Sequence, residues 1–356
     1  MDDIHIDGSH GEGGGSILRL SAALATIYKK KLHVTNIRAN RKVSGLRQQH
    51  VMGLKALADF SRGSLEGARV GSTEITYTPG EKKTRDLEVN IETAGSIGLV
   101  FQVLSIASAG ETVGGGTINV DIHGGATIGK WAPSSGFIQN VFIPLLSRMG
   151  MECKLEVLKH GFYPKGGAHA RITFTPPGKT LHGLKLENRG DIKRVDVESI
   201  ASKQLSKANV AKRQANAFSN AISELSIQEG VHLSPSIVGA RNPGSGITAW
   251  AITTTGCILS SGTIVGERGL PSETVGKRAA SNMLSLIKNS PAATVDQFTS
   301  DQLIPFMMLC REHSCFIAPE LTSHARTNID IFREFDKRPF TVREGKNSVR
   351  IDFPKS

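Results

Sequence analysis

Apolar residues follow helical and strand periods in a repeated order along the first half of the chain. Helical spacing predicts helices over residues 16–28 and 45–62, and two-residue alternation predicts strands over 32–38, 64–70 and 74–78. With a strand before the glycines that begin at Gly11, the first unit has the order βαβαββ. The same order recurs in strand 86–91, helix 97–109, strand 117–122, helix 134–149 and strands 152–158 and 168–174. The pattern therefore predicts a repeat of roughly 80–85 residues.

Elements of a third unit are separated by a segment with its own pattern. The third unit comprises a strand near 183–190, helices 273–288 and 304–312, and strands 313–318 and 349–353. The intervening segment contains a strand at 195–201, a polar helix at 206–225 and three strands that end at residue 265. We expect an α/β (α+β) fold with three βαβαββ repeats in a large domain, residues 1–185 and 267–356. A small α/β domain, residues 186–266, is inserted into it.

The charge balance favours a polyanionic partner. The chain carries 43 Lys and Arg against 32 Asp and Glu, a formal net charge of +11. A basic surface attracts nucleic acids through counterion release, although many basic proteins bind none. Aromatic residues make up only 5% of the chain. Stacking of bases on aromatic rings is therefore not the first expectation for any RNA contact.

The cysteines and the N-terminus point to a cytoplasmic protein. Cys153, Cys257, Cys310 and Cys315 form no CxxC pair, and His313 alone does not complete a zinc site with the last two. We expect reduced thiols. The first residues contain no basic and apolar signal sequence, and no apolar run approaches the roughly 20 residues of a membrane span.

A glycine-rich loop precedes the first helix. Residues 7–16 read Asp-Gly-Ser-His-Gly-Glu-Gly-Gly-Gly-Ser, which is neither a P-loop nor a dinucleotide fingerprint. Glycines allow close backbone approach, and the N-terminus of the following helix offers N–H groups to an anion. A plain tight turn explains the loop about as well. Glu12 would bind a metal ion or cap the N–H groups.

Three further segments have candidate chemistry and simple structural alternatives. Residues 38–50 place four Arg and Lys residues before a helix, which suits phosphate but also describes a solvated basic loop. Residues 160–167 include Pro164, Gly166 and Gly167, and hairpin chemistry is the stronger interpretation. His324 precedes an apolar pattern, and a single histidine among 11 is more often an ordinary residue than a catalytic one.

Together these segments resemble the RNA 3'-terminal phosphate cyclase family nearly end to end. The matching motifs, in order, are Asp7-Gly8-x-x-Gly11-Glu12-Gly13-Gly14-Gly15-x-Ile17-Leu18-Arg19, Ile37-Arg38-Ala39, Gly45-Leu46-x-x-Gln49-His50, Ala94-Gly95-Ser96 with Gln102, His160-Gly161-Phe162-Tyr163-Pro164-x-Gly166-Gly167, Asp301-Gln302-Leu303 and His324-x-x-Thr327-Asn328. Their number, order and spacing make the resemblance specific.

The resemblance implies a ligase-type, nucleotidyl-transferring enzyme that uses ATP and Mg²⁺ or Mn²⁺. In this family a histidine takes AMP from ATP and passes it to an RNA 3'-terminal phosphate. The neighbouring 2'-OH then displaces AMP and leaves a 2',3'-cyclic phosphate. The family fold has three βαβαββ repeats and a small inserted α/β domain. A homodimer is a further expectation.

The resemblance also assigns site residues by position. His324 would be the nucleophile, and Glu12 the carboxylate of the metal or nucleotide site. The residues that would bind ATP or AMP are Glu12, Arg19, Arg38, Arg41, Gln49, His50, Gln102, Pro133, Phe298, Asp301 and Gln302. Phe298 stands where the family has Tyr, so it would pack against adenine without a phenolic hydrogen bond.

Departures from the family pattern leave other functions to compare. Ser16 replaces a common Gln, Ala126 follows Gly124-Gly125 in place of Thr, and Ala168 follows Gly166-Gly167 in place of a third Gly. A non-catalytic, RNA-binding relative in ribosome assembly would lack the glycine loop or His324, and both are present. A carboxyvinyl transferase would not need the His-x-x-Thr-Asn motif. A general basic RNA-binding protein would consume no ATP.

Overall fold

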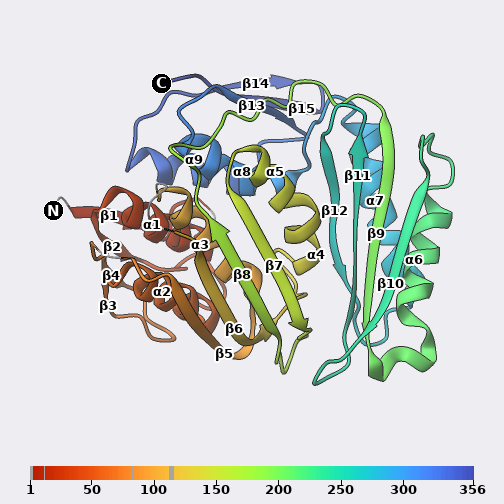
Figure 1. Cartoon of the computed structure of the whole chain (residues 1–356), viewed down its shortest axis with the longest axis horizontal. Helices are drawn as coiled ribbons and strands as arrows, with labels where there is room; N and C mark the ends of the chain where they lie inside the picture. The colour runs from red at the N-terminus through yellow and green to blue at the C-terminus, as the bar shows by residue number, and fades with distance from the viewer. Residues whose placement is uncertain (1–2, 12, 82, 112–115) are drawn as a thin grey trace.

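A computed structural model describes residues 3–11, 13–81, 83–111 and 116–356 (Figure 1). The first sheet has the strand order β1-β2-β4-β3, with β1 parallel to β2 and the other pairs antiparallel. The elements of this unit are β1 (Asp3–Asp7), α1 (Gly15–Tyr28), β2 (Lys31–Thr35), α2 (Gln48–Ser61), β3 (Ser64–Glu66) and β4 (Ile75–Thr78). Every element predicted for this unit is present.

The second sheet has the equivalent order, β5-β6-β8-β7, and the same parallel and antiparallel pairs. Its elements are β5 (Asp86–Ser96), α3 (Ile97–Ala109), β6 (Ile118–Ala126), α4 (Ser135–Phe137), a π-helical turn (Ile138–Phe142), α5 (Ile143–Arg148), β7 (Glu152–Lys159) and β8 (His169–Thr175). The helix predicted over residues 134–149 is therefore continuous but contains a π-helical segment. The sequence order of helices and strands matches that of the first unit.

A smaller antiparallel sheet follows near the C-terminus, with the order β13-β15-β14. Its elements are α8 (Gln297–Leu309), β13 (Ser314–Ala318), α9 (Ser323–Arg333), β14 (Thr341–Gly345) and β15 (Ser348–Phe353). The strand predicted near 183–190 is reduced to a single parallel bridge between Lys185 and Cys315. That bridge is flanked by two backbone hydrogen bonds, Leu186 N to Cys315 O and Cys315 N to Leu184 O.

The intervening segment forms a separate four-stranded sheet, at the right of Figure 1, with the order β10-β9-β11-β12. Its elements are β9 (Ile192–Ser202), a 3-10 turn (Lys203–Ala208), α6 (Val210–Ala221), β10 (Val231–Val238), β11 (Ser245–Thr253), β12 (Ile258–Val265) and α7 (Ser272–Asn289). The predicted strand, helix and three strands are all present. The assignment of α7 to the third repeat is wrong, because Val275, Ala279 and Met283 pack into the same core as Phe218 of α6 and Val195 of β9. The domain limits themselves stay a prediction, and this packing favours an inserted part that extends through α7.

The helices of the first two units and of the C-terminal part share one hydrophobic core. Leu18 and Leu24 of α1, Phe101 of α3 and Phe306 of α8 are all buried in it, together with Phe332 of α9. In Figure 1 these helices lie between the first two sheets and the small C-terminal sheet. Since α1 contacts α2, α3 and α9, segments far apart in sequence meet there.

Two observations concern the chemistry expected of the whole chain. All four cysteines are free, which confirms the expectation of thiols, and Cys257, Cys310 and Cys315 are buried. Within the described ranges, no helix combines the length and the apolar composition that crossing a bilayer requires.

Candidate nucleotide-transfer site

The glycine loop is packed so closely that side chains would not fit at several positions. A Cβ at Gly11, whose φ is +53°, would collide with the Thr327 hydroxyl of α9. A Cβ at Gly13 would lie 3.2 Å from Asn40, whose side-chain amide donates to the Ser9 carbonyl at 2.8 Å. The loop is thus held between α9 and the segment after β2. Glu12, the predicted metal or nucleotide carboxylate, lies outside the described residues.

The glycine loop leads directly into α1. No described side chain caps the first N–H groups of this helix. The N-cap is Gly14, and among the residues that the structure describes no side chain accepts a hydrogen bond from the first turn. Uncapped N–H groups and the helix dipole together favour an anion at this position. The loop therefore has the geometry of an anion site, in addition to being a tight turn.

His324 lies directly beside this helix end. Its Nδ1 is 3.4 Å from the Ser16 hydroxyl of α1, across 308 positions of sequence. His324 is in the first turn of α9, which Thr322 caps by accepting from the Ala325 amide at 2.9 Å. Two helix N-termini therefore face the same region as the imidazole.

Asp301 orients the helix that carries His324. Its carboxylate accepts the Thr322 hydroxyl, and its backbone carbonyl accepts from the Asn328 side chain at 2.9 Å. Both contacts join α8 to α9. Thr327 and Asn328 of the His-x-x-Thr-Asn motif also position α9. Thr327 packs on the glycine loop, and Asn328 joins α9 to α8 through its hydrogen bond to Asp301.

Arg19, Gln102 and Gln302 form a chain of hydrogen bonds that joins α1, α3 and α8. Arg19 Nε donates to Gln102 Oε1 at 2.9 Å, and Gln102 Nε2 donates to Gln302 Oε1 at 3.0 Å. Arg19 is only 8% exposed, and burial lowers the pKa of its guanidinium to about 10. No carboxylate of the described residues forms an ion pair with Arg19. Arg19 is therefore a buried positive charge without a carboxylate partner among the described residues, and an anionic ligand would supply the counter-charge.

Further cations surround His50. Burial, followed by the charges of Arg47 and Arg41, lowers the pKa of Arg38, so these guanidinium groups lie close together. Arg41 also approaches the loop, because a Cβ at Gly14 would lie 3.1 Å from its Nη2. A cluster of guanidinium groups is suited to the oxygens of a polyphosphate.

The neutral ring of His50 lies against the N-terminus of α1. Its Nδ1 accepts from the Arg47 amide at 3.0 Å, so the proton of the neutral ring is on Nε2. The Nε2 edge faces Gly15, where a Cβ would overlap the ring. Burial, with the charges of Arg19, Arg38 and Arg47, lowers the His50 pKa to about 3.

This shift predicts acid sensitivity of the fold. In the unfolded chain His50 binds a proton near its ordinary pKa of 6.5, whereas in the folded protein it binds one only near pH 3. The contribution of His50 to the free energy of unfolding is therefore fully present above pH 6.5 and is lost as the pH falls from 6.5 toward 3. We expect His50 to account for a loss of about 1 kcal/mol of unfolding free energy per pH unit.

Urea unfolding at about pH 7 and about pH 5 measures this effect. His50→Gln is expected to lose less stability on acidification than the wild type. His232→Gln, at an exposed histidine of β10, provides the control. An unchanged pH slope in His50→Gln would contradict the assignment.

The remaining predicted residues lie on the rim of this cluster. Gln49 packs against Gly95, where a Cβ would lie 3.4 Å from the Gln49 Cβ. The Pro133 carbonyl contacts Gly98 at the start of α3. Phe298, in the first turn of α8, is 42% exposed and lies against Gly262 of β12. Phe298 thus lies against the inserted sheet, one helical turn before Gln302, and Pro133 contacts α3 one turn before Gln102.

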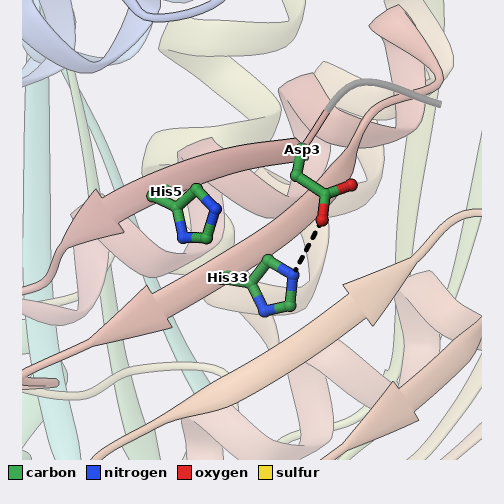
Figure 2. A group of neighbouring side chains, drawn as sticks. All are labelled: Asp3, His5 and His33. Atoms are coloured by element: carbon green, nitrogen blue, oxygen red, sulfur yellow. Dashed lines mark hydrogen bonds and ion pairs between the residues drawn. The ribbon is translucent and has the colours of Figure 1, made fainter.

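The groups that could hold a metal ion in the described residues are elsewhere. They are Asp3, His5 and His33; Asp121, His123 and His169; and His313, Cys315 and Asp352. Figure 2 shows the first, in which Asp3 points toward His33 at a distance of 3.3 Å between Oδ2 and Nε2. Asp3 also pairs with Lys31 at 3.7 Å, and it lies at the end of β1 remote from the glycine loop. None of these groups contains a predicted site residue.

Sequence reasoning missed several positioning residues. Thr322 precedes Ser323 and His324 as a typical N-cap residue, a signal that could have predicted the start of α9. The sequence marks Ser16 only as a departure from the family pattern, whereas its hydroxyl contacts His324. Nothing in the local sequence indicated that Asn40 would hold the glycine loop through Ser9.

The fold and this site define an α/β protein in which a histidine lies among helix N-termini and guanidinium groups. The chain belongs to the RNA 3'-terminal phosphate cyclase family, whose sequence profile matches residues 10–342. It is similar to the RNA 3'-terminal phosphate cyclase of Caldivirga maquilingensis, with 38% identity over 93% of this chain and 92% of the relative. The cyclases of Pyrococcus furiosus (37% identity, 98% of both chains) and Methanothermobacter thermautotrophicus (35%, 98% of this chain and 99% of the relative) are also similar.

Proposed function

We propose that this protein uses ATP to convert the 3'-terminal phosphate of RNA into a 2',3'-cyclic phosphodiester. Full-length similarity to cyclases at 32–38% identity supports the activity. The observation in the structure that carries the proposal is the position of His324. Its Nδ1 is 3.4 Å from Ser16, beside the uncapped N-terminus of α1 and the cations around Arg19.

In the first step, a ring nitrogen of His324 attacks the α-phosphorus of ATP. A P–N bond forms, the bond to the β-phosphate oxygen breaks, and pyrophosphate leaves. Imidazole suits this role because it is nucleophilic near neutral pH when uncharged and forms a labile phosphoramidate. Arg19, Arg38 and Arg41 offset the charge that develops on the phosphates, and the His50 Nε2–H donates to them.

In the second step, an oxygen of the RNA 3'-phosphate attacks the same phosphorus and displaces the histidine. The RNA end then carries AMP, which is a good leaving group where the bare phosphate monoester had none. In the third step, the 2'-OH attacks the adjacent 3'-phosphorus, loses its proton and expels AMP. This last step is intramolecular, so proximity supplies much of the rate.

We extend the proposal to the nucleotide pocket and the metal ion. Gln49, Gln102, Asp301 and Gln302 surround the nucleotide, and adenine lies between Pro133 and Phe298. Glu12 is the proposed protein ligand of Mg²⁺ or Mn²⁺. When bound, the ion would neutralise phosphate charge. The described side chains proposed for the phosphates are cationic and do not ligate a metal ion. The nucleotide phosphates and Glu12 would therefore hold most of its coordination sphere.

Three other expectations stay proposals. The bridge at Lys185 gives the small C-terminal sheet a first strand in the equivalent position, which supports a third βαβαββ repeat with the insertion between its first strand and α8. A cytoplasmic location and a homodimer are the other two. The free cysteines are compatible with the first of these.

The test is a product assay with purified protein, ATP, Mg²⁺ and an RNA that ends in a 3'-phosphate. We expect phosphatase-resistant 2',3'-cyclic ends, with AMP and pyrophosphate formed in equal amounts to the ends cyclised. RNA that ends in a 3'-OH should give none. If ends remain phosphatase-sensitive with every divalent metal tried, the proposed activity is wrong.

A further inference from the structure

Trp131 is exposed to a degree that the isolated protein does not explain. It lies in the loop between β6 and α4 with 96% of its surface exposed, and its φ is +58°, in the left-handed region that bulky residues rarely adopt. The Lys130 ammonium, which also pairs with Glu267 at 2.9 Å, lies over the Trp131 ring at 5.7 Å from the ring centroid. Exposure of a large apolar ring and backbone strain both cost free energy, and such costs concentrate at binding sites.

A second exposed aromatic residue lies on an adjoining turn. Tyr163, between β7 and β8, is 78% exposed. Its turn packs against the Trp131 loop through a bridge between Ile128 and Phe162, which form a small apolar cluster with Ile200 of β9. The Tyr163 carbonyl accepts from Asn242 of the β10–β11 turn at 2.9 Å. Figure 1 accordingly places the β7–β8 and β10–β11 turns at the same edge of the molecule.

A basic groove adjoins these turns. It has a volume of about 590 Å³ and lies between the ends of β7 and β10, where Lys159, His160 and Arg241 line it. Arg241 packs over Gly167 of the Tyr163 turn, and Lys165 is exposed on the same turn. Among the described residues, no carboxylate pairs with Lys159, Lys165 or Arg241. The groove thus offers uncompensated positive charge next to two exposed aromatic rings.

The Trp131 loop is connected to the candidate site through α3. Pro133, two residues after Trp131, contacts Gly98 in the first turn of α3. Gln102 lies one helical turn further along, about 6 Å at the helical rise. It belongs to the Arg19–Gln102–Gln302 chain. An RNA end held at His324 therefore has this surface within reach of its preceding nucleotides.

We propose that Lys130, Trp131, Lys159, Tyr163, Lys165 and Arg241, the Trp131 surface, bind the single-stranded RNA segment that precedes the reacting 3' end. Bases stack on Trp131 and Tyr163, and the phosphates follow the groove between the catalytic part and the inserted sheet. Aromatic platforms beside a cationic groove are the general solution for single-stranded nucleic acid. The proposal rests on the proposed cyclase function for the identity of the strand.

Direct binding is tested by fluorescence, because the chain has only 2 tryptophans, Trp131 and Trp250, and Trp250 is buried at 9% exposure. An RNA of about twelve nucleotides with a 3'-phosphate is titrated into the protein without ATP. We expect quenching of the emission of exposed tryptophan and its absence in Trp131→Phe. Trp131→Ala should weaken binding about tenfold by anisotropy, and Trp131→Phe should retain most of it.

The charged part of the surface is tested by salt dependence. The Lys159→Ala/Arg241→Ala double variant should bind more weakly and lose part of the slope of log affinity against log salt. Arg343→Ala, an exposed arginine on β14, is the matched control and should leave both unchanged. Equal slopes for the double variant and the wild type would overturn the groove assignment.

An activity comparison separates this proposal from the cyclase function itself. Trp131→Ala should transfer AMP from ATP to the protein at the wild-type rate and cyclise a nucleoside 3'-phosphate normally, but show a KM about tenfold higher for the longer RNA. If Trp131→Ala kept the KM of the wild type for the longer RNA, the Trp131 surface would not be an RNA-binding site. If the wild-type protein transferred no AMP, the proposed cyclase function would be wrong. The fluorescence titration would then still show whether the Trp131 surface binds RNA.

Discussion

His324→Asn is expected to abolish the transfer of AMP from ATP to the protein, with a loss of more than about 1,000-fold. Asparagine occupies a similar volume and can still hydrogen-bond to Ser16, but its amide nitrogen has no nucleophilic lone pair. The fold should be unaffected, because Thr322 still caps α9 and Asp301 still binds Thr322. Incubation with α-³²P-ATP and Mg²⁺, without RNA, measures the acid-labile label on the protein.

The informative control is RNA that already carries AMP on its 3'-phosphate. His324→Asn should cyclise this RNA, because the third step uses the 2'-OH of the RNA in place of the histidine. His182→Asn, at an exposed histidine remote from the site, should label like the wild type. Label retained on His324→Asn would mean that another residue is the nucleophile.

Arg19→Met is expected to raise stability while it lowers activity about 100-fold. Arg19 is buried without a described carboxylate partner, and burial lowers its pKa to about 10. Replacing a buried charge by an apolar side chain of similar length removes its desolvation cost, for a gain of about 1 kcal/mol. Its loss leaves the phosphates without the cation that Gln102 positions at 2.9 Å.

Urea unfolding and single-turnover AMP transfer measure the two effects on the same preparation. Arg69→Met, at an exposed arginine, should change neither. The assignment of Arg19 to the phosphates would be disproved if Arg19→Met lost stability and kept its rate of AMP transfer, since Arg19 would then be a structural residue only. The opposite signs make this variant more informative than a loss of activity alone.

Periodicity predicted most elements because local pattern and tertiary packing agree in the first two units. The start of α8 is an exception. The pattern predicts this helix from residue 304, but it begins at Gln297 and continues through Pro305. Proline normally marks a helix start, since it lacks an N–H and crowds the preceding turn. Here Asp296 caps the helix by accepting from Phe298 and Thr299, each at 2.9 Å. The three residues Phe298, Asp301 and Gln302 are therefore helical.

Other features could not be read from the sequence because they depend on contacts between distant segments. Helical periodicity in α7 indicates an amphipathic helix, but not which sheet it covers. Composition made aromatic stacking a secondary expectation for RNA contact. An average over the chain does not reveal that Trp131 and Tyr163 are both exposed and lie on adjoining turns. The resemblance named Arg19, Gln102 and Gln302 separately, and only the structure joins them.

The contact between Ser16 and His324 spans 308 positions, so the candidate site is assembled from segments that are far apart in the sequence. During synthesis the first two sheets emerge before the inserted sheet, but the core that their helices share with α8 and α9 closes only after those helices have followed, because domains generally fold as units. His324, the proposed nucleophile, emerges after the inserted sheet, and β15, which follows it, pairs with β13 to close the small sheet. Under the proposed mechanism, a nascent chain that has not yet reached α9 therefore adenylates no RNA ends, even where it already binds RNA. A product shortened before α9 would keep the glycine loop and its cations but transfer no AMP.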